Sequence, residues 1–210
     1  MPYVNEAINK FTSDLSAKLP APGGGSAAAL VGAVASSLNC MVGNFTVGNE
    51  KFAGVEAEVK ALLKASEDAR DELLKLVEED IVAYGNYSKA SKMPKTTEVE
   101  KGARAKALEE ALLGAAKVPY NIMVSCHKVL RVCEPMAAKG NRNLLSDVGV
   151  AAYFANAALK SAYLNVIVNF LYLKEEAIKS KILKETETLL KSADEIEGRI
   201  EAECHKNLKR

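Results

Sequence analysis

Residues 55–91, VEAEVKALLKASEDARDELLKLVEEDIVAYGNYSKAS, indicate the fold class most directly. Apolar and small side chains recur in this stretch every three or four residues, which is the spacing of one face of an α-helix. We predict one long amphipathic helix that ends before Pro94, because proline cannot continue it. Its apolar stripe consists of Val59, Leu62, Leu63, Ser66, Ala69, Leu73, Leu76, Val77 and Ile81.

Two further helices are predicted before this one. Apolar residues at helical spacing indicate an amphipathic helix over about residues 2–19. The segment PAPGGGS, residues 20–26, then interrupts it, since two prolines and three glycines cannot extend a helix. We predict that Ser26 is the N-cap of a second helix of mostly small residues, which runs to about residue 48.

Three more helices are predicted after residue 91. Thr97 begins a fourth, which should kink or restart at Pro119. A turn at residues 140–143 precedes a mostly buried fifth helix over about residues 144–172. A charged amphipathic helix covers residues 174–206, and its apolar seam packs either on the bundle or on another subunit. The seam consists of Ile182, Leu189 and Ile196, with Ala193 and Ile200 beside it.

No segment alternates as a β-strand would, so the sequence predicts an all-α, single-domain bundle of about five to six long helices over residues 1–210. The 210-residue length and 49% hydrophobic content are typical of one globular domain. The fifth helix and the charged last helix present more apolar surface than one small bundle buries easily. We therefore predict a homodimer.

The composition limits which binding partners and which cellular compartment we expect for the protein. A net charge of +1 supplies no broad basic field, so we expect no nucleic-acid partner. The four cysteines are too dilute for a disulfide scaffold, and the N-terminus lacks a secretory leader pattern. Polar residues interrupt both apolar stretches, residues 148–173 and 27–42, so we expect no membrane span. The expected protein is soluble and cytoplasmic, with four free thiols at Cys40, Cys126, Cys133 and Cys204.

Asp80 is the most informative single residue. Leu73, Val77, Asp80 and Tyr84 lie on one helical face, whereas Glu79 is about 100° around the helix. A carboxylate on an apolar face costs several kcal/mol unless it is paired or hydrogen-bonded. Periodicity alone leaves two interpretations open: a carboxylate at the edge of the stripe or in a core ion pair, and a functional group.

The glycine-rich segment at Gly23, Gly24, Gly25 and Ser26 also permits two interpretations. Backbone amides at the start of a helix bind anions, and glycines let a ligand approach the backbone. The segment is neither a Walker loop nor a dinucleotide-binding loop, since it lacks their residues and context. The alternative is a corner where two helices pack closely.

Asp147 and Asn165 lie near the two ends of the fifth predicted helix. Eighteen residues separate them, so they share a face at a distance of about 27 Å. Both can serve one site only if the ligand is long or the site spans subunits. His127, His205 and the cysteines lack zinc-ligand spacing, and no nucleophile-elbow motif is present. We therefore expect neither a metal nor a cofactor.

Several ordered motifs together resemble the cyclodeaminase/cyclohydrolase family of folate one-carbon enzymes. The resemblance covers nearly the whole chain, although Tyr84 stands where many relatives have Phe. The matching motifs are PGGGSAAA at residues 22–29, Gly48, Phe52, EDIVAY at 79–84, MPK at 93–95, Val118-Pro119, Gly140-Asn141, SDVGVA at 146–151 and AYLNV at 162–166.

The resemblance implies an all-helical subunit that dimerises, with the folate site near the subunit interface. It implies that Asp80 is the catalytic aspartate. It also implies that Gly23, Gly24, Gly25, Ser26, Asp147 and Asn165 belong to the folate-binding parts. No metal is implied.

Our first interpretation is hydrolysis of 5,10-methenyltetrahydrofolate to 10-formyltetrahydrofolate, with Asp80 orienting or deprotonating the attacking water. The length of the chain, without a transferase domain, favours this reaction over its family alternative. That alternative is the cyclodeaminase reaction, which expels ammonia from 5-formiminotetrahydrofolate. An interpretation of another class is a helical interaction module with no chemistry.

Overall fold

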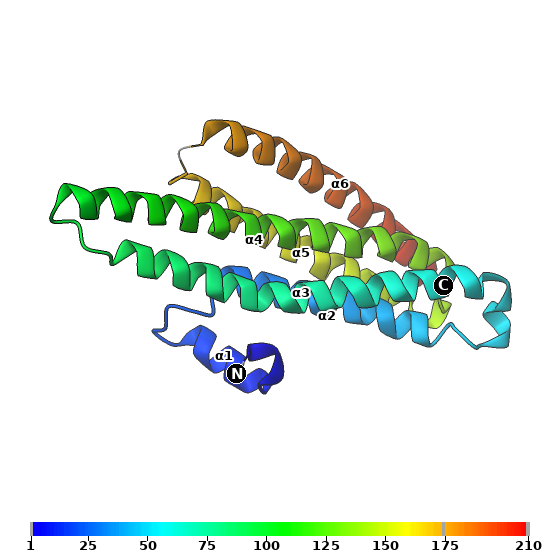
Figure 1. The fold of residues 1–210 in the computed structure, drawn as a ribbon. Helices are drawn as coiled ribbons and strands as arrows, with labels where there is room; N and C mark the ends of the chain where they lie inside the picture. The colour runs from blue at the N-terminus through cyan, green and yellow to red at the C-terminus, as the bar shows by residue number, and fades with distance from the viewer. Residues whose placement is uncertain (1, 174, 209–210) are drawn as a thin grey trace.

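The computed structural model describes residues 2–173 and 175–208, and within this part of the chain all regular structure is helical. Six α-helices and three 3₁₀ turns follow one another along the chain (Figure 1). The all-α prediction with five to six long helices is therefore confirmed. In order, the elements are η1 (Tyr3–Asn5), α1 (Ile8–Ser16), α2 (Gly24–Asn44), η2 (Glu50–Val55), α3 (Glu56–Ser91), α4 (Glu98–Lys139), η3 (Arg142–Leu144), α5 (Leu145–Phe170) and α6 (Glu176–Leu208).

Helices α2, α3, α4 and α5 form an up-and-down bundle in which each helix packs on its neighbours and α5 closes the ring against α2 (Figure 1). Helix α6 lies outside this ring, in contact with α4 and α5. Small side chains of α2 and α5 allow the helices to pack closely around larger residues such as Leu73 and Ile122. The bundle core includes Ala28, Ala29, Ala33, Leu73, Leu76, Ile122, Met123, Leu130, Ala155 and Leu159.

Helix α3 confirms the prediction for residues 55–91 almost to the residue. Leu73, Leu76 and Val77 are fully or almost fully buried, as their place in the apolar stripe requires. Thr97 is the N-cap of α4, as predicted, and its hydroxyl accepts the N–H of Glu100 at 3.2 Å. The carboxylate of Glu100 accepts the N–H of Thr97 in return, which completes a capping box.

The helix was predicted to kink or restart at Pro119, and the restart is wrong, because α4 continues through this residue as one helix. Proline has no N–H, so the carbonyl of Ala115 one turn earlier loses its helical donor. The side chain of Asn169 on α5 replaces that donor, since its Nδ2 donates to the Ala115 oxygen at 2.9 Å. A side chain from the neighbouring helix thus satisfies the carbonyl that proline leaves free.

The N-terminal predictions also need correction. The helix expected over residues 2–19 is split, because Glu6 and Ala7 have extended backbone angles between η1 and α1. Ser26 is not an N-cap: α2 begins two residues earlier, after an extended Gly23, and Ser26 lies in its first turn. Its hydroxyl is engaged elsewhere, as described below.

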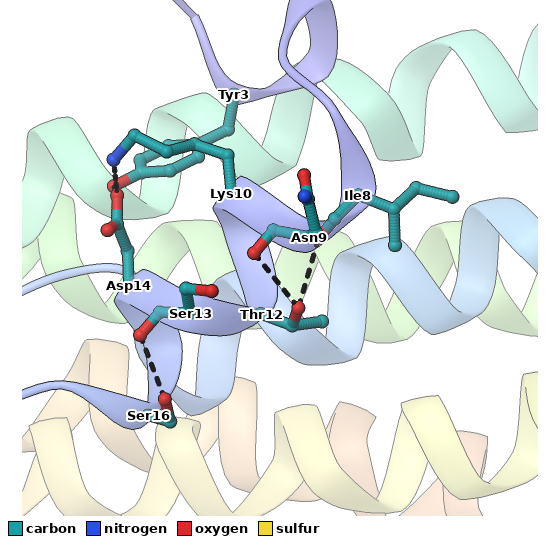
Figure 2. Close-up of polar contacts among 8 residues, drawn as sticks. All are labelled: Tyr3, Ile8, Asn9, Lys10, Thr12, Ser13, Asp14 and Ser16. Carbon is teal, nitrogen blue, oxygen red and sulfur yellow. Dashed lines mark hydrogen bonds and ion pairs between the residues drawn. The ribbon is translucent and has the colours of Figure 1, made fainter.

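Short polar contacts hold the N-terminal segment together (Figure 2). The Tyr3 hydroxyl donates to Asp14 at 2.6 Å, and Lys10 forms an ion pair with the same carboxylate. The Tyr3 ring also meets Phe11 edge-on, with 5.6 Å between the ring centroids. One hydrogen bond, from the Val4 N–H to Glu78 at 3.1 Å, ties this segment to α3.

The apolar seam of α6 packs on the bundle of its own chain. Ala193, Ile196 and Ile200 are buried, and Ile182 and Leu189 pack against the same core. Helices α5 and α6 are separate and lie against each other, rather than forming one rod. The seam therefore needs no second subunit to cover it.

Within residues 2–173 and 175–208, one helix, α2, is long and apolar enough to cross a membrane by length and composition alone. In its most apolar stretch, 61% of the residues are buried inside the protein. A core helix of a bundle has the same properties.

Candidate functional site

A cavity of about 310 Å³ opens where the start of α2 meets α3, the middle of α4 and the end of α5. This volume lies at the lower end of the range for small-molecule sites. A larger hollow of about 820 Å³ lies under the N-terminal segment, but it does not contain Asp80. The smaller cavity is lined by Pro20, Ala21, Gly23, Gly24, Gly25, Asp80, Ala83, Tyr84, Tyr87, Leu112, Ala115, Asn165, Val168, Asn169 and Tyr172.

Asp80 is fixed by the first turn of α2. One carboxylate oxygen, Oδ2, accepts the backbone N–H of Ser26 at 2.8 Å and the hydroxyl of Ser26 at 2.7 Å. No donor among the described residues binds the other oxygen, Oδ1. Asp80 therefore offers a free oxygen to the cavity while its orientation is held by two bonds.

Glycine at position 25 is what allows this contact. A Cβ atom on Gly25 would lie 2.1 Å from Asp80 Oδ1 and 2.6 Å from its Cγ, which is far inside van der Waals contact. A Cβ on Gly24 would touch only Asn165, at 3.6 Å, and one on Gly23 would meet nothing within 4 Å. Close packing therefore requires glycine at position 25, but not at positions 23 and 24.

Burial raises the pKa of Asp80 above its ordinary value, and the hydroxyl and backbone bonds from Ser26 oppose this rise. The carboxyl thus loses its proton at a higher pH than an exposed aspartate. A carboxyl with a raised pKa, held at a cavity, is a better proton acceptor than an exposed aspartate and is suited to accept and return a proton.

The neighbouring acids on α3 face elsewhere, as the helical phase predicts. Glu79 lies 3.4 Å from Lys75 in an exposed ion pair, and Glu78 accepts the N–H of Val4. Glu79 is also absent from the lining of the Asp80 cavity. The placement of Asp80 on the buried face of α3 is confirmed.

Two asparagines of α5 form the opposite wall of the cavity. Asn165 Nδ2 donates to the Ser161 carbonyl at 2.9 Å, and Asn169 Nδ2 donates to Ala115 and to the Asn165 carbonyl, both at 2.9 Å. These bonds orient both amides, and they leave the side-chain oxygens for a ligand. Asn165 was predicted as a site residue. Asn169 was not predicted, and the structure places it in the cavity wall, where its amide also donates to the Ala115 carbonyl.

Five of the seven predicted site residues line one cavity: Gly23, Gly24, Gly25, Asp80 and Asn165. Ser26 is fully buried behind Asp80 and contacts the carboxylate rather than the cavity. Asp147 lies in the first turn of α5, about 27 Å along that helix from Asn165. Within one chain, Asp147 therefore does not reach the cavity, and its binding role remains a prediction.

The sequence placed Tyr84 on the helical face of Asp80, but the aromatic residues were not predicted as part of the site. Tyr84, Tyr87 and Tyr172 line the cavity together with Leu112 of α4. Tyr84 and Tyr87 lie one and two turns beyond Asp80 on the same helix, so helical spacing from Asp80 was a usable signal for both. Tyr172 follows α5 in a turn, and no periodicity pointed to it.

Other chemistries find little support among the described residues. No group of three or more His, Cys, Asp or Glu side chains there is arranged to hold a metal ion. Burial raises the pKa of both Cys126 and Cys133 to about 12, so their thiols are poor nucleophiles. All four cysteines are free and buried, as expected for the thiols. The site offers a carboxylate, amides and aromatic walls, which suit proton transfer on a flat polar ligand.

Comparisons with known proteins agree with this chemistry. The family model described as formiminotransferase-cyclodeaminase matches residues 7–188. A methenyltetrahydrofolate cyclohydrolase of Methylorubrum extorquens is 42% identical over 196 residues, which are 93% of this chain and 94% of that protein.

More distant relatives are larger proteins. A formimidoyltransferase-cyclodeaminase of Mus musculus is 32% identical over 90% of this chain, but the match covers 35% of that protein.

The crystal structure of a formiminotetrahydrofolate cyclodeaminase from Thermotoga maritima superposes with a TM-score of 0.89. It is 28% identical, and the match covers 98% of both chains.

The raised pKa of Asp80 predicts a stabilising substitution. The folded protein holds this proton more tightly than the unfolded chain does. The contribution of Asp80 to stability is therefore full below its unfolded pKa and is lost as the pH rises through the folded pKa. At pH 7, Asp80→Asn should raise the melting temperature, and the gain should shrink as the pH falls toward 4. Thermal melts monitored by circular dichroism test this.

Glu79→Gln is the matched control, since Glu79 is an exposed neighbour with one surface ion pair. Its melting temperature should stay close to that of the wild type at each pH. A lower melting temperature for Asp80→Asn at pH 7 would contradict the inferred burial cost.

Proposed function

The chain belongs to the formiminotransferase-cyclodeaminase family, and on that premise we propose that it hydrolyses 5,10-methenyltetrahydrofolate to 10-formyltetrahydrofolate. The observation that carries this proposal is the half-buried Asp80, which Ser26 holds with one oxygen toward the cavity. The 42% identity to a methenyltetrahydrofolate cyclohydrolase, over nearly the full length of both proteins, supports the choice of reaction.

The chemistry of the substrate suits this carboxylate. The methenyl carbon joins N5 and N10 of the folate and carries a delocalised positive charge. An ionised Asp80 beside it supplies a counter-charge in a partly dry cavity, where electrostatic attraction is stronger than in water. This attraction also favours the ionised form of Asp80 once the substrate is bound.

Hydrolysis then requires two proton movements. Water adds to the methenyl carbon as Asp80 takes one of its protons, which gives a neutral intermediate with a hydroxyl on that carbon. The bond between the carbon and N5 breaks as Asp80 returns its proton to N5. The hydroxyl loses its proton to solvent, and the formyl group remains on N10. Water is consumed and one proton is released, so atoms and charge balance.

The remaining cavity residues would hold the pterin. The N–H groups of Gly24 and Gly25 lie in the first turn of α2, where backbone donors have no acceptor within the helix. They can bind the oxygen and nitrogen acceptors of the pterin ring. The amide oxygens of Asn165 and Asn169 can accept from its amino group, and Tyr84 and Tyr87 provide apolar ring surface.

The second candidate is the formiminotetrahydrofolate cyclodeaminase reaction. The close superposition with the Thermotoga maritima cyclodeaminase favours it, since the TM-score is 0.89 over 98% of both chains. Asp80 would then deliver a proton to the departing ammonia as N10 closes the ring. The two candidates separate in one assay, because only the cyclodeaminase releases ammonia and produces the methenyl compound.

We also propose that the protein is a homodimer formed through the outer faces of α2 and α5. Helix α6 covers α4 and α5 on one side of the bundle, whereas these outer faces keep large apolar side chains in solvent. Exposed apolar surface of this extent is typical of an interface. The residues are Val31, Val34, Val150, Tyr153, Phe154, Leu164 and Val168, each 38% to 65% exposed.

An antiparallel pairing of α5 with its copy would have a consequence for the site. Asp147 and Asn165 are placed symmetrically about residue 156, near the middle of α5. A two-fold axis there would bring Asp147 of the partner subunit toward the Asn165 end. This arrangement would let Asp147 contribute to folate binding despite its distance within one chain.

Asp80→Asn should lower turnover roughly a hundredfold or more at saturating methenyltetrahydrofolate, the usual scale for loss of a general acid–base group. The side chain keeps its shape but can no longer accept the proton. The absorbance loss of the methenyl compound, corrected for spontaneous hydrolysis, measures turnover. Glu79→Gln, on the next residue but outside the cavity, should change turnover little. Equal rates for Asp80→Asn and the wild type would remove Asp80 from the mechanism.

Gly25→Ala should also abolish most turnover, because the added methyl group would displace the Asp80 carboxylate from 2.1 Å away. Gly198→Ala on α6 is the control, since nothing lies within 4 Å of the added methyl group and residue 198 does not line the cavity. The same absorbance assay, with circular dichroism to confirm folding, compares the two variants. Full activity in Gly25→Ala would show that the close approach of α2 to Asp80 is not needed.

Light scattering should give twice the 22.5 kDa chain mass at micromolar concentration. Phe154→Glu, on the outer face of α5, should shift the protein toward the monomer, because a charge would be buried in the interface. Val82→Glu is the control, since Val82 is 61% exposed on α3, away from the outer faces of α2 and α5. A monomer mass for the wild type at every accessible concentration would refute the dimer.

A further inference from the structure

Ser26 does not reach a ligand in the Asp80 cavity, although the sequence resemblance placed it among the folate-binding parts. Its side chain is fully buried, and it is absent from the lining of the cavity. Its hydroxyl makes two contacts instead: it donates to Asp80 Oδ2 at 2.7 Å, and its oxygen accepts the Gly23 N–H at 3.5 Å. Any role of Ser26 in the reaction must therefore act through Asp80.

These contacts determine which oxygen of Asp80 takes a proton. The Gly23 N–H occupies a lone pair of the Ser26 oxygen, so the hydroxyl proton is left to donate to Asp80. Oδ2 also accepts the backbone N–H of Ser26 at 2.8 Å, so both of its lone pairs are engaged. A proton on Oδ2 would break one of these bonds. The proton therefore binds Oδ1, the oxygen that Asp80 offers to the cavity.

No charged side chain shares this task with Ser26 among the described residues that line the cavity. Asp80 is the only Asp, Glu, Lys, Arg or His there, and α4 and α5 contribute only apolar and amide side chains. The other titratable groups are the phenols of Tyr84, Tyr87 and Tyr172. Burial raises the pKa of Asp80, and the two bonds from Ser26 oppose that rise. Ser26 is thus the group that favours the ionised carboxylate before substrate binds.

We propose that Ser26 is a positioning residue for the hydrolysis: its hydroxyl keeps Asp80 ionised, with Oδ1 toward the cavity, until the substrate binds. The inference rests on the proposed function, in which Asp80 takes a proton from water and returns it to N5. The O–H bond of the water breaks and the proton binds Oδ1. It leaves Oδ1 for N5 as the bond between the methenyl carbon and N5 breaks. Ser26 keeps its own proton throughout.

Ser26→Ala isolates the hydroxyl. The backbone N–H of residue 26 still donates to Oδ2, so the carboxylate stays anchored at the start of α2. Ser26→Cys is a second variant of nearly the same shape, with a weaker donor and a smaller expected effect. The matched control is Ser36→Ala. It removes another fully buried hydroxyl of α2, which donates to the Ser66 carbonyl at 2.7 Å and does not contact Asp80.

Carbon NMR of protein with labelled aspartate carboxyls measures the pKa of Asp80 without any substrate. The chain has six aspartates, and the resonance that is missing from Asp80→Asn identifies Asp80. Loss of a hydrogen bond to the ionised carboxylate should raise this pKa by about one unit in Ser26→Ala and by less in Ser26→Cys. Ser36→Ala should leave it unchanged. An unchanged pKa in both Ser26 variants, or an equal rise in Ser36→Ala, would overturn the inference.

The pH dependence of kcat/KM for methenyltetrahydrofolate links this pKa to the reaction. The wild-type value should fall at acid pH as Asp80 becomes protonated, because kcat/KM reports groups of the free enzyme. This fall should begin about one pH unit higher in Ser26→Ala and stay in place in Ser36→Ala. Well above that range, Ser26→Ala should approach the wild-type value. A loss of the same size at every pH would show that Ser26 supports only the fold.

The two measurements also separate this inference from the proposed function. A wild type without turnover of methenyltetrahydrofolate refutes the hydrolysis, whereas a raised Asp80 pKa in Ser26→Ala still supports the hold of Ser26 on the carboxylate. Turnover in the wild type, together with an Asp80 pKa that neither Ser26 variant changes, refutes the role of Ser26 alone.

Discussion

Asp80 is held against the first turn of α2 by two hydrogen bonds from Ser26, and the two helices can meet there only because residue 25 has no side chain. A carboxylate on the buried face of α3 would otherwise carry a large desolvation cost. The same contact places the start of α2, its free amides and the cavity beside one carboxylate oxygen. Helix packing and the candidate chemistry therefore depend on a single junction.

Much of this arrangement could be predicted from residue patterns, and the rest could not. The stripe of α3 placed Asp80 on the buried face, and the capping sequence at Thr97 placed the start of α4. Both are local signals. The start of α2 was misplaced because Ser26 has the side chain of an N-cap, while its actual partner is 54 residues away. The aromatic residues of the cavity were not predicted for a related reason. Tyr172 reaches the cavity only through the packing of α5 on the bundle.

The chain has two apolar surfaces outside the four-helix core, and only one of them is covered by its own chain. The heptad-like seam of α6 looked equally suited to the bundle or to another subunit, and it packs within its own chain on α4 and α5. The mixed apolar face of α2 and α5 stays exposed, which agrees with the prediction that the fifth helix is mostly rather than wholly buried. The buried face of α5 carries Ala155, Leu159 and Phe170, whereas Phe154 and Leu164 are exposed on its outer face.

The contact from Asn169 to the Ala115 carbonyl links two positions that are far apart in the chain. Pro119 creates the unpaired carbonyl, and Asn169 satisfies it while also lining the cavity. The proline at position 119 therefore relies on the Asn169 amide to satisfy this carbonyl. Loss of Asn169 would leave a helical carbonyl without a donor, whereas replacement of Pro119 would make the Asn169 amide redundant there. Across related proteins, these two positions should therefore vary together, as a coupled pair inherited as a unit.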